Sequence, residues 1–225
     1  MTIKDYLEPR KYPGRVIIAG NTAQGKAVLC YAIMGRSANS RNRLFSFEED
    51  GTLKTVPFEE DKVEDPSLVI YNCMRQYEDK VILTNGSQTD LVYETLEAGG
   101  SFEDAVVRMG YEPDAPNYTP RISCLFDESE STYRLAIARK EGDGTVRVIW
   151  NYPVQKGYGH CIHTYLESDS GMLPPFTLDP ERLELPESLE EVVDQVWSAL
   201  DEDNRISLFV QVGDEMTTLN KNNGD

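Results

Sequence analysis

The chain has 225 residues, of which 40% are hydrophobic and 27% are charged, and its formal net charge is -17. This composition is typical of a folded protein with a sizeable core. Strong net acidity argues against general nucleic-acid binding, because that affinity comes from cations that neutralise phosphates. No apolar run approaches the roughly 18–20 residues that span a bilayer, so we expect no membrane association.

The cysteines are scattered, without a Cys-x-x-Cys pair, which argues against a zinc ribbon or a disulfide scaffold. They are Cys30, Cys73, Cys124 and Cys161. Reduced cysteines suit the cytosol, and the N-terminus lacks the apolar core of a signal peptide. We therefore expect a cytoplasmic protein. With no internal repeat and no linker, residues 1–225 are predicted to form a single domain, with a frayed tail at 220–225.

The first half of the chain begins with apolar runs of strand length. Residues 15–19 and 27–34 flank turn residues at 21–25, which predicts a hairpin. Residues 68–71 and 80–84 are predicted to form a second pair of strands. A polar turn is expected to follow at residues 85–90.

Two helices are predicted next. The first covers residues 90–98 and ends at Gly99-Gly100, a typical C-terminal stop. Ser101 and Asp104 then resemble a capping box. The apolar face of the second helix consists of Phe102, Ala105, Val106 and Met109. Two helices in series between sets of strands favour a layered architecture of helices and sheets.

The second half returns to strands and adds one long helix. An amphipathic helix is predicted over 189–200, with Pro186 and Glu187 in its first turn. Glu141-Gly-Asp-Gly144 predicts a hairpin turn. The predicted strands are 121–126, 133–138, 146–150, 160–166 and 206–212.

An arginine-rich loop stands out from this acidic background. Arg36-Ser-Ala-Asn-Ser-Arg-Asn-Arg43 holds three arginines, and the longer stretch from Pro9 to Phe47 has no Asp or Glu. The planar guanidinium fork suits phosphate and carboxylate. The pattern therefore indicates an anion site, and its alternative is a solvated loop whose arginines pair with acids elsewhere.

Other candidate sites are weaker. His160 and His163 are three apart on a predicted strand and so face opposite sides, which argues against a shared metal. We expect no metal and no cofactor. Cys73 is typical of a small buried residue, and turn chemistry explains Ser87 better than a nucleophile does. Tyr71 is predicted to end a strand, as a hydrogen-bond donor or proton shuttle, or else as a half-buried aromatic.

Several motifs in order resemble the archaeal-type IMP cyclohydrolase family. The resemblance runs from about Tyr12 to Tyr165. It is carried by Gly14-Arg15, Tyr31, Arg36-Ser37, Asn42-Arg43, Tyr71-Asn72-Cys73, Thr84-Asn-Gly-Ser-Gln-Thr-Asp90, Thr119-Pro-Arg-Ile122 and His163-Thr-Tyr165.

The resemblance implies an α+β fold like that of the N-terminal nucleophile hydrolases. Its four αββα layers are two stacked, mainly antiparallel sheets flanked by helices. The chain departs from the family in a longer arginine loop with an extra Arg41, in Gln88 where the family has histidine, in an extension at residues 1–11 and in an acidic C-terminal region.

The implied reaction closes the purine ring of 5-formamidoimidazole-4-carboxamide ribotide, with loss of water, to give IMP. By resemblance, Arg43 stabilises the developing oxyanion and Tyr71 transfers or orients a proton. Glu112 is the candidate base or orienter, and its alternative is an ordinary loop acid. For Asp90, capping of the following helix is the stronger reading. The residues expected to bind the substrate are Arg15, Arg36, Ser37, Asn42, Asn72, Asn85, Ser87, Thr89, Asp90 and Arg121.

The expected partner is thus a purine ribonucleotide, and the family implies a homo-oligomer. Two alternatives remain open. One is a protein that binds purine ribotides without catalysis, and the other is an amidohydrolase of the same fold. The second needs an N-terminal nucleophile, whereas no Cys, Ser or Thr begins the first predicted strand.

Overall fold

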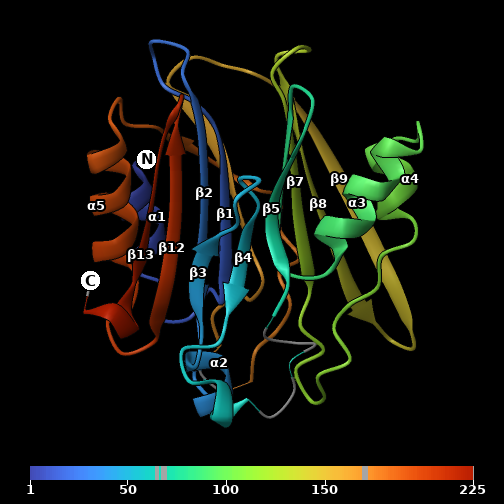
Figure 1. Ribbon diagram of the computed structural model, residues 1–225, viewed down its shortest axis with the longest axis vertical. Helices are drawn as coiled ribbons and strands as arrows, with labels where there is room; N and C mark the ends of the chain where they lie inside the picture. The colour runs from blue at the N-terminus through green and yellow to red at the C-terminus, as the bar shows by residue number, and fades with distance from the viewer. Residues whose placement is uncertain (64–65, 67–69, 169–171, 225) are drawn as a thin grey trace.

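The computed structural model describes residues 1–63, 66, 70–168 and 172–224. Two antiparallel sheets stack face to face, and helices cover the outer face of each (Figure 1). The order of layers is helix, sheet, sheet, helix, which confirms the predicted α+β class and its αββα arrangement. The closer likeness to N-terminal nucleophile hydrolases stays a prediction.

Six strands of the described chain form the first sheet, in the order β11-β10-β1-β2-β12-β13. Helices α1 and α5 lie on its outer face (Figure 1). The bounds are α1 Ile3–Leu7, β1 Arg15–Asn21, β2 Ala27–Met34, β10 Tyr158–His163, β11 Glu181–Glu184, α5 Leu189–Ala199, β12 Arg205–Val212 and β13 Glu215–Asn220.

Seven strands of the described chain form the second sheet, in the order β3-β4-β5-β6-β7-β8-β9. Helices α3 and α4 cover it, while α2 lies at one end of the sandwich (Figure 1). The bounds are α2 Ala38–Arg41, β3 Leu44–Phe47, β4 Leu53–Val56, η1 Glu60–Lys62, β5 Asn72–Tyr77, β6 Lys80–Thr84, α3 Gln88–Glu97, α4 Phe102–Val106, β7 Arg121–Asp127, β8 Thr132–Glu141, β9 Gly144–Pro153 and η3 Lys221–Asn223.

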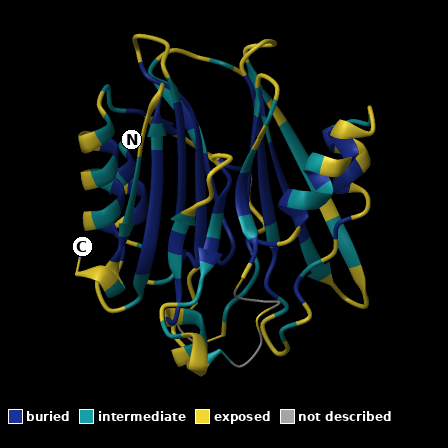
Figure 2. Ribbon diagram, viewed as in Figure 1, coloured by how far each residue is buried: buried dark blue, intermediate teal, exposed yellow. Residues whose placement is uncertain are grey.

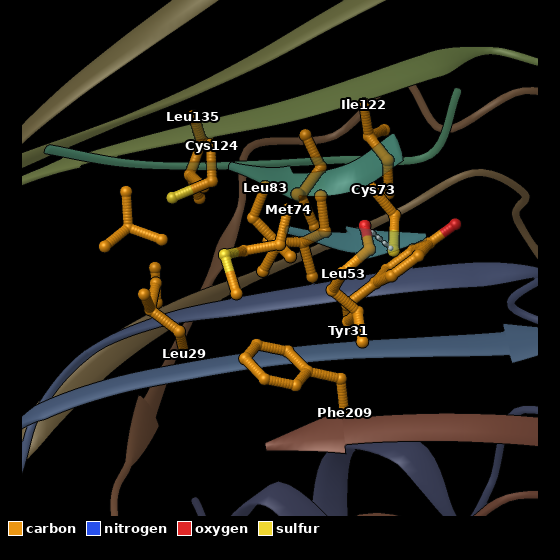
Figure 3. Close-up of a cluster of buried hydrophobic side chains, with 14 of the residues drawn as sticks. Leu29, Tyr31, Leu53, Cys73, Met74, Leu83, Ile122, Cys124, Leu135 and Phe209 are labelled. Carbon is orange, nitrogen blue, oxygen red and sulfur yellow. Dashed lines mark hydrogen bonds between the residues drawn. The ribbon is translucent and has the colours of Figure 1, made fainter. Parts of the chain in front are cut away.

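The apolar core has three layers, one between the two sheets and one between each sheet and its covering helices, because both faces of each sheet are covered. Along β2, Leu29 and Tyr31 point between the sheets, whereas Cys30 and Ala32 point toward α1 and α5. Side chains alternate across a strand, so a strand covered on both sides is a continuous apolar run. Figure 3 shows the inner layer, and Figure 2 shows burial concentrated in the strands.

Most predicted elements are present near their expected positions. The hairpin of β1 and β2 and the turn between β8 and β9 are confirmed. The Ser101 capping box is also confirmed, with both of its reciprocal hydrogen bonds. Helix α5 is confirmed too, but Ser188 caps it, so Pro186 and Glu187 precede the helix instead of forming its first turn.

The strand predicted at residues 68–71 is wrong in its described part. Residues 67–69 lie outside the described residues, and Tyr71 precedes β5, which starts at Asn72. The polar group around Tyr71 therefore begins a strand instead of ending one. The polar turn at 85–90 is shorter than predicted, because α3 already starts at Gln88.

Four short strands and two short helices were not predicted, because their apolar patterns are brief. They are β3, β4, β11, β13, α1 and α2. Helix α1 begins with a capping box between Thr2 and Asp5 and buries Ile3 and Leu7 against the outer face of the first sheet. None of the described helices has the length and apolarity needed to cross a membrane.

The tail predicted to fray begins with a segment in which Asn220 and Asn222 hydrogen-bond to the rest of the chain. Asn220 is buried and its Oδ1 accepts a hydrogen bond from the Phe45 amide at 2.8 Å, which ties β13 of one sheet to β3 of the other. The Asn222 side chain donates to the Arg41 carbonyl at 2.9 Å. The C-terminal segment therefore braces the arginine loop.

We expect Asn220→Ala to lower stability, because it leaves the buried Phe45 amide without its acceptor. Such a loss costs about 1–3 kcal/mol, or about 2–4 °C in Tm per kcal/mol for a chain of this size. Thermal unfolding measures it. The matched control is Asn223→Ala, at an exposed position. Equal midpoints for the two variants would contradict this role.

Candidate active site

Two buried arginines and one buried glutamate meet in one cleft at the end of the sandwich. Arg15 is the first residue of β1, and Arg43 follows α2 and precedes β3. Arg15, Arg43 and Glu112 are only 7%, 2% and 4% exposed. They line a cleft of about 280 Å³, together with Tyr12, Arg36, Ser37, Asn39, Ser40, Asp114, Asn117, Thr119, Tyr165 and Leu173.

The two buried guanidinium groups keep unused hydrogen-bond donors. Arg43 donates from Nε to the Ser40 carbonyl at 2.9 Å, but its Nη1 is buried and has no hydrogen-bond partner within the described chain. The Nε of Arg15 is likewise buried and has no hydrogen-bond partner among the described residues. Buried donors are nearly always paired in folded proteins, so these two atoms are available to an acceptor that enters the cleft.

The charges of the cleft act on one another. Burial, and then the charge of Arg15, lower the pKa of Arg43. Burial also opposes ionisation of Arg15, but Glu112 and several tyrosines outweigh it, so the pKa of Arg15 is raised. Burial raises the pKa of Glu112, and Arg15 and Arg121 oppose that rise. A carboxyl with a raised pKa is suited to proton transfer near neutral pH.

Tyr71 does not line the described cleft, but it lies close enough to Arg43 and Arg15 for their charges to act on it. Its hydroxyl lies 2.8 Å from the hydroxyl of Tyr31, and both side chains are buried. Burial raises the pKa of Tyr71, while the nearby charges of Arg43 and Arg15 oppose the rise. The main chain of Tyr71 is fixed by hydrogen bonds with Thr55, the amide of Tyr71 donating to the Thr55 hydroxyl at 3.1 Å. The phenol is therefore held beside the guanidinium groups.

Two glycines of the sequence motifs make room for neighbouring side chains. Gly14 has φ +81°, and a Cβ there would lie 2.2 Å from the Thr164 hydroxyl and 2.6 Å from the ring of Tyr165. A Cβ on Gly86 would lie 2.0 Å from Nη1 of Arg121. Arg121 donates from that nitrogen to Gln88 at 2.6 Å and adds positive charge beside Glu112.

Arg36 and Ser37 lie at the exposed mouth of the cleft. The guanidinium of Arg36 sits 4.9 Å from the centre of the Tyr12 ring, and a cation over an aromatic face is attracted to it. Ser37 caps α2 by accepting from the Ser40 amide at 3.1 Å. Arg41, by contrast, bonds to the Gly35 carbonyl and the Asn204 side chain.

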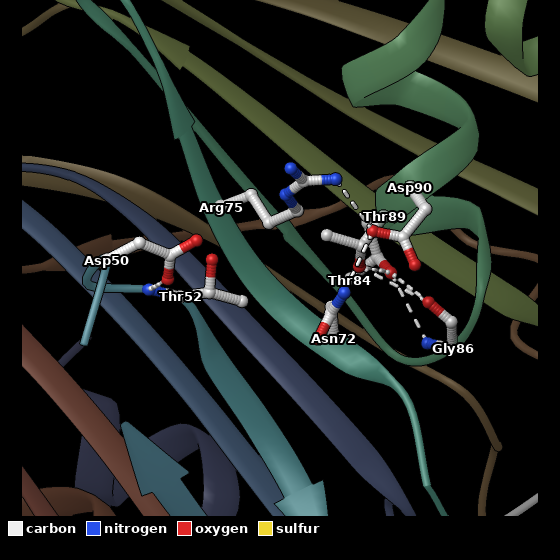
Figure 4. Close-up of polar contacts among 8 residues, drawn as sticks. All are labelled: Asp50, Thr52, Asn72, Arg75, Thr84, Gly86, Thr89 and Asp90. Atoms are coloured by element: carbon white, nitrogen blue, oxygen red, sulfur yellow. Dashed lines mark hydrogen bonds and ion pairs between the residues drawn. The ribbon is translucent and has the colours of Figure 1, made fainter. Parts of the chain in front are cut away.

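Asn72 and Asp90 lie apart from the cleft, on the side of the second sheet that α3 covers (Figure 4). Asn72 donates to Asp90 at 2.9 Å, and Arg75 donates to the same carboxylate oxygen at 3.0 Å. Asp90 is the third residue of α3, so it is not the N-cap. The three side chains form a polar cluster between β5 and α3.

The other predicted binding residues mostly brace the chain. Asn85 donates to the Pro120 carbonyl at 2.9 Å and accepts from the Ile122 amide at 2.8 Å, which fixes the segment carrying Arg121. Asn42 exchanges two hydrogen bonds with the main chain of Glu59. Thr89 pairs with the Thr84 hydroxyl at 2.7 Å, and Ser87 is an exposed N-cap. These four do not line the described cleft.

Part of the wall of the cleft consists of residues to which the sequence assigns no role. Thr119 and Tyr165 belong to the quoted motifs but received no role, and Tyr12 and Asp114 stand next to such motifs. For Tyr12, Thr119 and Tyr165 the signal was polarity close to the start or end of a strand. Asp114 lies in the loop before β7 and gave no such signal. A pattern in one sequence cannot show that residues 12, 114, 119 and 165 converge.

The two histidines lie on opposite faces of β10, as predicted. Nδ1 of His160 lies 2.6 Å from the Tyr133 hydroxyl between the sheets, whereas Nε2 of His163 lies 3.0 Å from the Tyr6 hydroxyl of α1. Within the described ranges, no group of three or more His, Cys, Asp or Glu side chains is arranged to hold a metal ion.

Comparison with known proteins identifies the relatives of this chain. The model of the family described as IMP cyclohydrolase-like protein matches residues 12–217. The IMP cyclohydrolase of Methanococcus maripaludis is 28% identical over 187 residues, covering 78% of this chain and 91% of the relative. That of Methanopyrus kandleri is 31% identical over 146 residues, covering 59% of this chain and 72% of the relative. The predicted resemblance is confirmed, and the chain belongs to the IMP cyclohydrolase-like protein family.

Proposed function

We propose that this protein is an IMP cyclohydrolase, which closes the purine ring of 5-formamidoimidazole-4-carboxamide ribotide to give IMP and water. One observation carries the proposal. Arg15 and Arg43 bury unpartnered donors beside the buried Glu112, in a cleft of about 280 Å³. The membership of the family supports the same reaction.

The reaction joins two groups of one molecule. The carboxamide nitrogen bonds to the formyl carbon, and the formyl oxygen leaves as water with one proton from each of the two nitrogens that flank that carbon. Because the step is intramolecular, the enzyme must hold the reactive rotamer. It must also move protons and stabilise negative charge on the formyl oxygen. The substrate brings a 5′-phosphate, which needs cations.

Arg43 is the proposed donor to the formyl oxygen. Its Nη1 is buried and unpartnered among the described residues, while its Nε is fixed by the Ser40 carbonyl. A preorganised donor of this kind stabilises an oxyanion without reorganising during the reaction. Arg15 provides a second buried donor beside it. Tyr71, next to both charges, orients the reacting amide or relays its proton.

Glu112 is the proposed base. Its carboxyl faces both arginines, and burial raises its pKa. It can accept a proton from the attacking nitrogen and return it to the departing hydroxyl. The phosphate is assigned to the mouth of the cleft, where Arg36 and Ser37 are exposed, because a dianion loses less hydration there than in the interior.

We also propose a cytoplasmic location and a homo-oligomer. The first is supported by the four cysteines, which are buried free thiols, since free thiols persist in a reducing compartment. The second rests on the family alone, and light scattering after size exclusion measures it.

The purified protein is expected to convert the formylated ribotide to IMP, measured by chromatography. Arg43→Ala should reduce kcat by about 10²–10³, the usual loss for one oxyanion donor. The matched control is Arg139→Ala, which removes an arginine that pairs with Glu141 outside the cleft and should retain wild-type activity. A folded wild-type protein that binds the ribotide without turnover would instead support a binding protein.

Glu112→Gln should abolish most activity without lowering stability at pH 7. The pKa of Glu112 is raised in the folded state, so its ionisation opposes folding as pH rises through that value. The variant should therefore unfold at an equal or higher temperature than wild type at pH 7. This difference should vanish below the ordinary carboxyl pKa. Lower stability at pH 7 would show that the carboxylate is retained for structure.

Tyr71→Phe is compared with Tyr31→Phe, because the two hydroxyls share one hydrogen bond. If the Tyr71 hydroxyl acts on the substrate, its loss should lower kcat by about 10–100-fold, within the range for proton transfer by a side chain. Tyr31→Phe removes the shared bond only and should cost less. Equal losses in steady-state kinetics would reduce Tyr71 to a packing role.

A further inference from the structure

Tyr165 closes one wall of the cleft and has no role in the chemistry above. Its side chain is 2% exposed, and its hydroxyl lies 2.5 Å from the hydroxyl oxygen of Thr119. Thr119 donates its own hydroxyl hydrogen to Asp114 at 2.5 Å. Since a hydroxyl has one hydrogen, Thr119 accepts from Tyr165, and the three side chains form a directed chain of hydrogen bonds.

This chain closes the loop that presents Glu112. Asp114 also accepts from the amide of Thr119 at 2.6 Å, so its carboxylate binds both donors of one residue. The carbonyl of Thr119 in turn accepts from the amide of Glu112 at 2.9 Å. The main chain of the proposed base is therefore fixed by the residue whose side chain contacts Tyr165.

Tyr165 is also linked to the N-terminal helix α1, through hydrogen bonds of His163. Its carbonyl lies 2.8 Å from Nδ1 of His163, and because a carbonyl only accepts, that nitrogen carries the proton. Burial lowers the pKa of His163 to about 4, so at neutral pH its Nε2 accepts from the Tyr6 hydroxyl at 3.0 Å. Tyr6 belongs to α1, outside the residues 12–217 that the family model matches.

We propose that Tyr165 is a positioning residue for ring closure, fixing Glu112 through Thr119 while His163 and Tyr6 of α1 hold it in place. This inference rests on the proposed function. It also gives the N-terminal extension a role at the active site, because hydrogen bonds connect α1 to the loop of the base.

The test compares Thr119→Val with Thr119→Ser. Valine has nearly the same shape but no hydroxyl, whereas serine keeps the hydroxyl. Thr119→Val loses the hydroxyl's bonds to both Tyr165 and Asp114. We expect it to lower kcat by at least about fivefold to tenfold, the rate equivalent of one hydrogen bond, with KM within about twofold. Thr119→Ser should remain within about twofold of wild type. Tyr165→Phe removes only the bond between Tyr165 and Thr119, so it should lower kcat by no more than Thr119→Val does. The double variant should be no slower than Thr119→Val, because that single variant has already lost the same bond.

The pH profile supplies a readout that packing alone does not move. Glu112 faces Arg15 from β1, Arg43 from the end of α2, Arg121 from β7 and Asp114 from its own loop. None of these charges changes in Thr119→Val. A Glu112 freed from its buried position is less desolvated, so the acid limb of the kcat profile should move to lower pH.

The outcomes separate the two proposals. Wild-type kcat and an unchanged pH profile in both Thr119→Val and Tyr165→Phe would overturn the positioning role, while loss of activity in Glu112→Gln would leave the proposed function standing. Failure of the wild-type protein to form IMP would overturn both. Tyr6→Phe should shift kcat and the acid limb in the same direction as Tyr165→Phe by a smaller amount, and a change in melting temperature alone would exclude α1 from the site.

Discussion

The burial of two guanidinium groups beside one carboxyl is the constraint on which the rest of the site depends. Removing an arginine from water is costly unless its charge and its donors find partners. Arg15 gains from Glu112, but Arg43 is disfavoured both by burial and by Arg15. Two buried donors still lack partners within the described chain. The folded protein thus maintains an electrostatic arrangement that, in the proposed function, an anionic substrate completes.

The fold supports this arrangement by approaching the cleft from both sheets. Arg15 belongs to β1 of the first sheet. Arg43 directly precedes β3 of the second sheet, and Glu112 lies in the loop that follows α4, the helix on the outer face of that second sheet. The buried core between the sheets fixes the distance between these elements. Asn220 ties the two sheets together next to the arginine loop. The buried charges of the cleft lower the stability of the folded state, and the apolar layers of the core compensate for this loss.

The sequence predicted what local patterns encode. Long apolar runs identified β1 and β2, and the spacing of Ser101 and Asp104 identified the start of α4. Short strands such as β3 have too few apolar residues to give a signal. The polar segment at Asn72 starts β5, whereas the sequence pattern predicts the end of a strand there. Local patterns do not show which distant side chains meet in the folded protein. Motif order placed Arg15, Arg43 and Glu112 in one site, but it also included Asn72 and Asp90, which bond to each other near α3. Only the topology shows which polar residues point into the cleft.

A crystal structure with bound IMP would show whether the two buried arginines meet the nucleotide. We expect the nucleotide to occupy the cleft of about 280 Å³, with acceptors on Nε of Arg15 and Nη1 of Arg43, the purine ring against Glu112 and the phosphate near Arg36. Nucleotide bound instead in the neighbouring hollow beside Asn42 and Glu59, with both arginine nitrogens still unpartnered, would contradict this expectation.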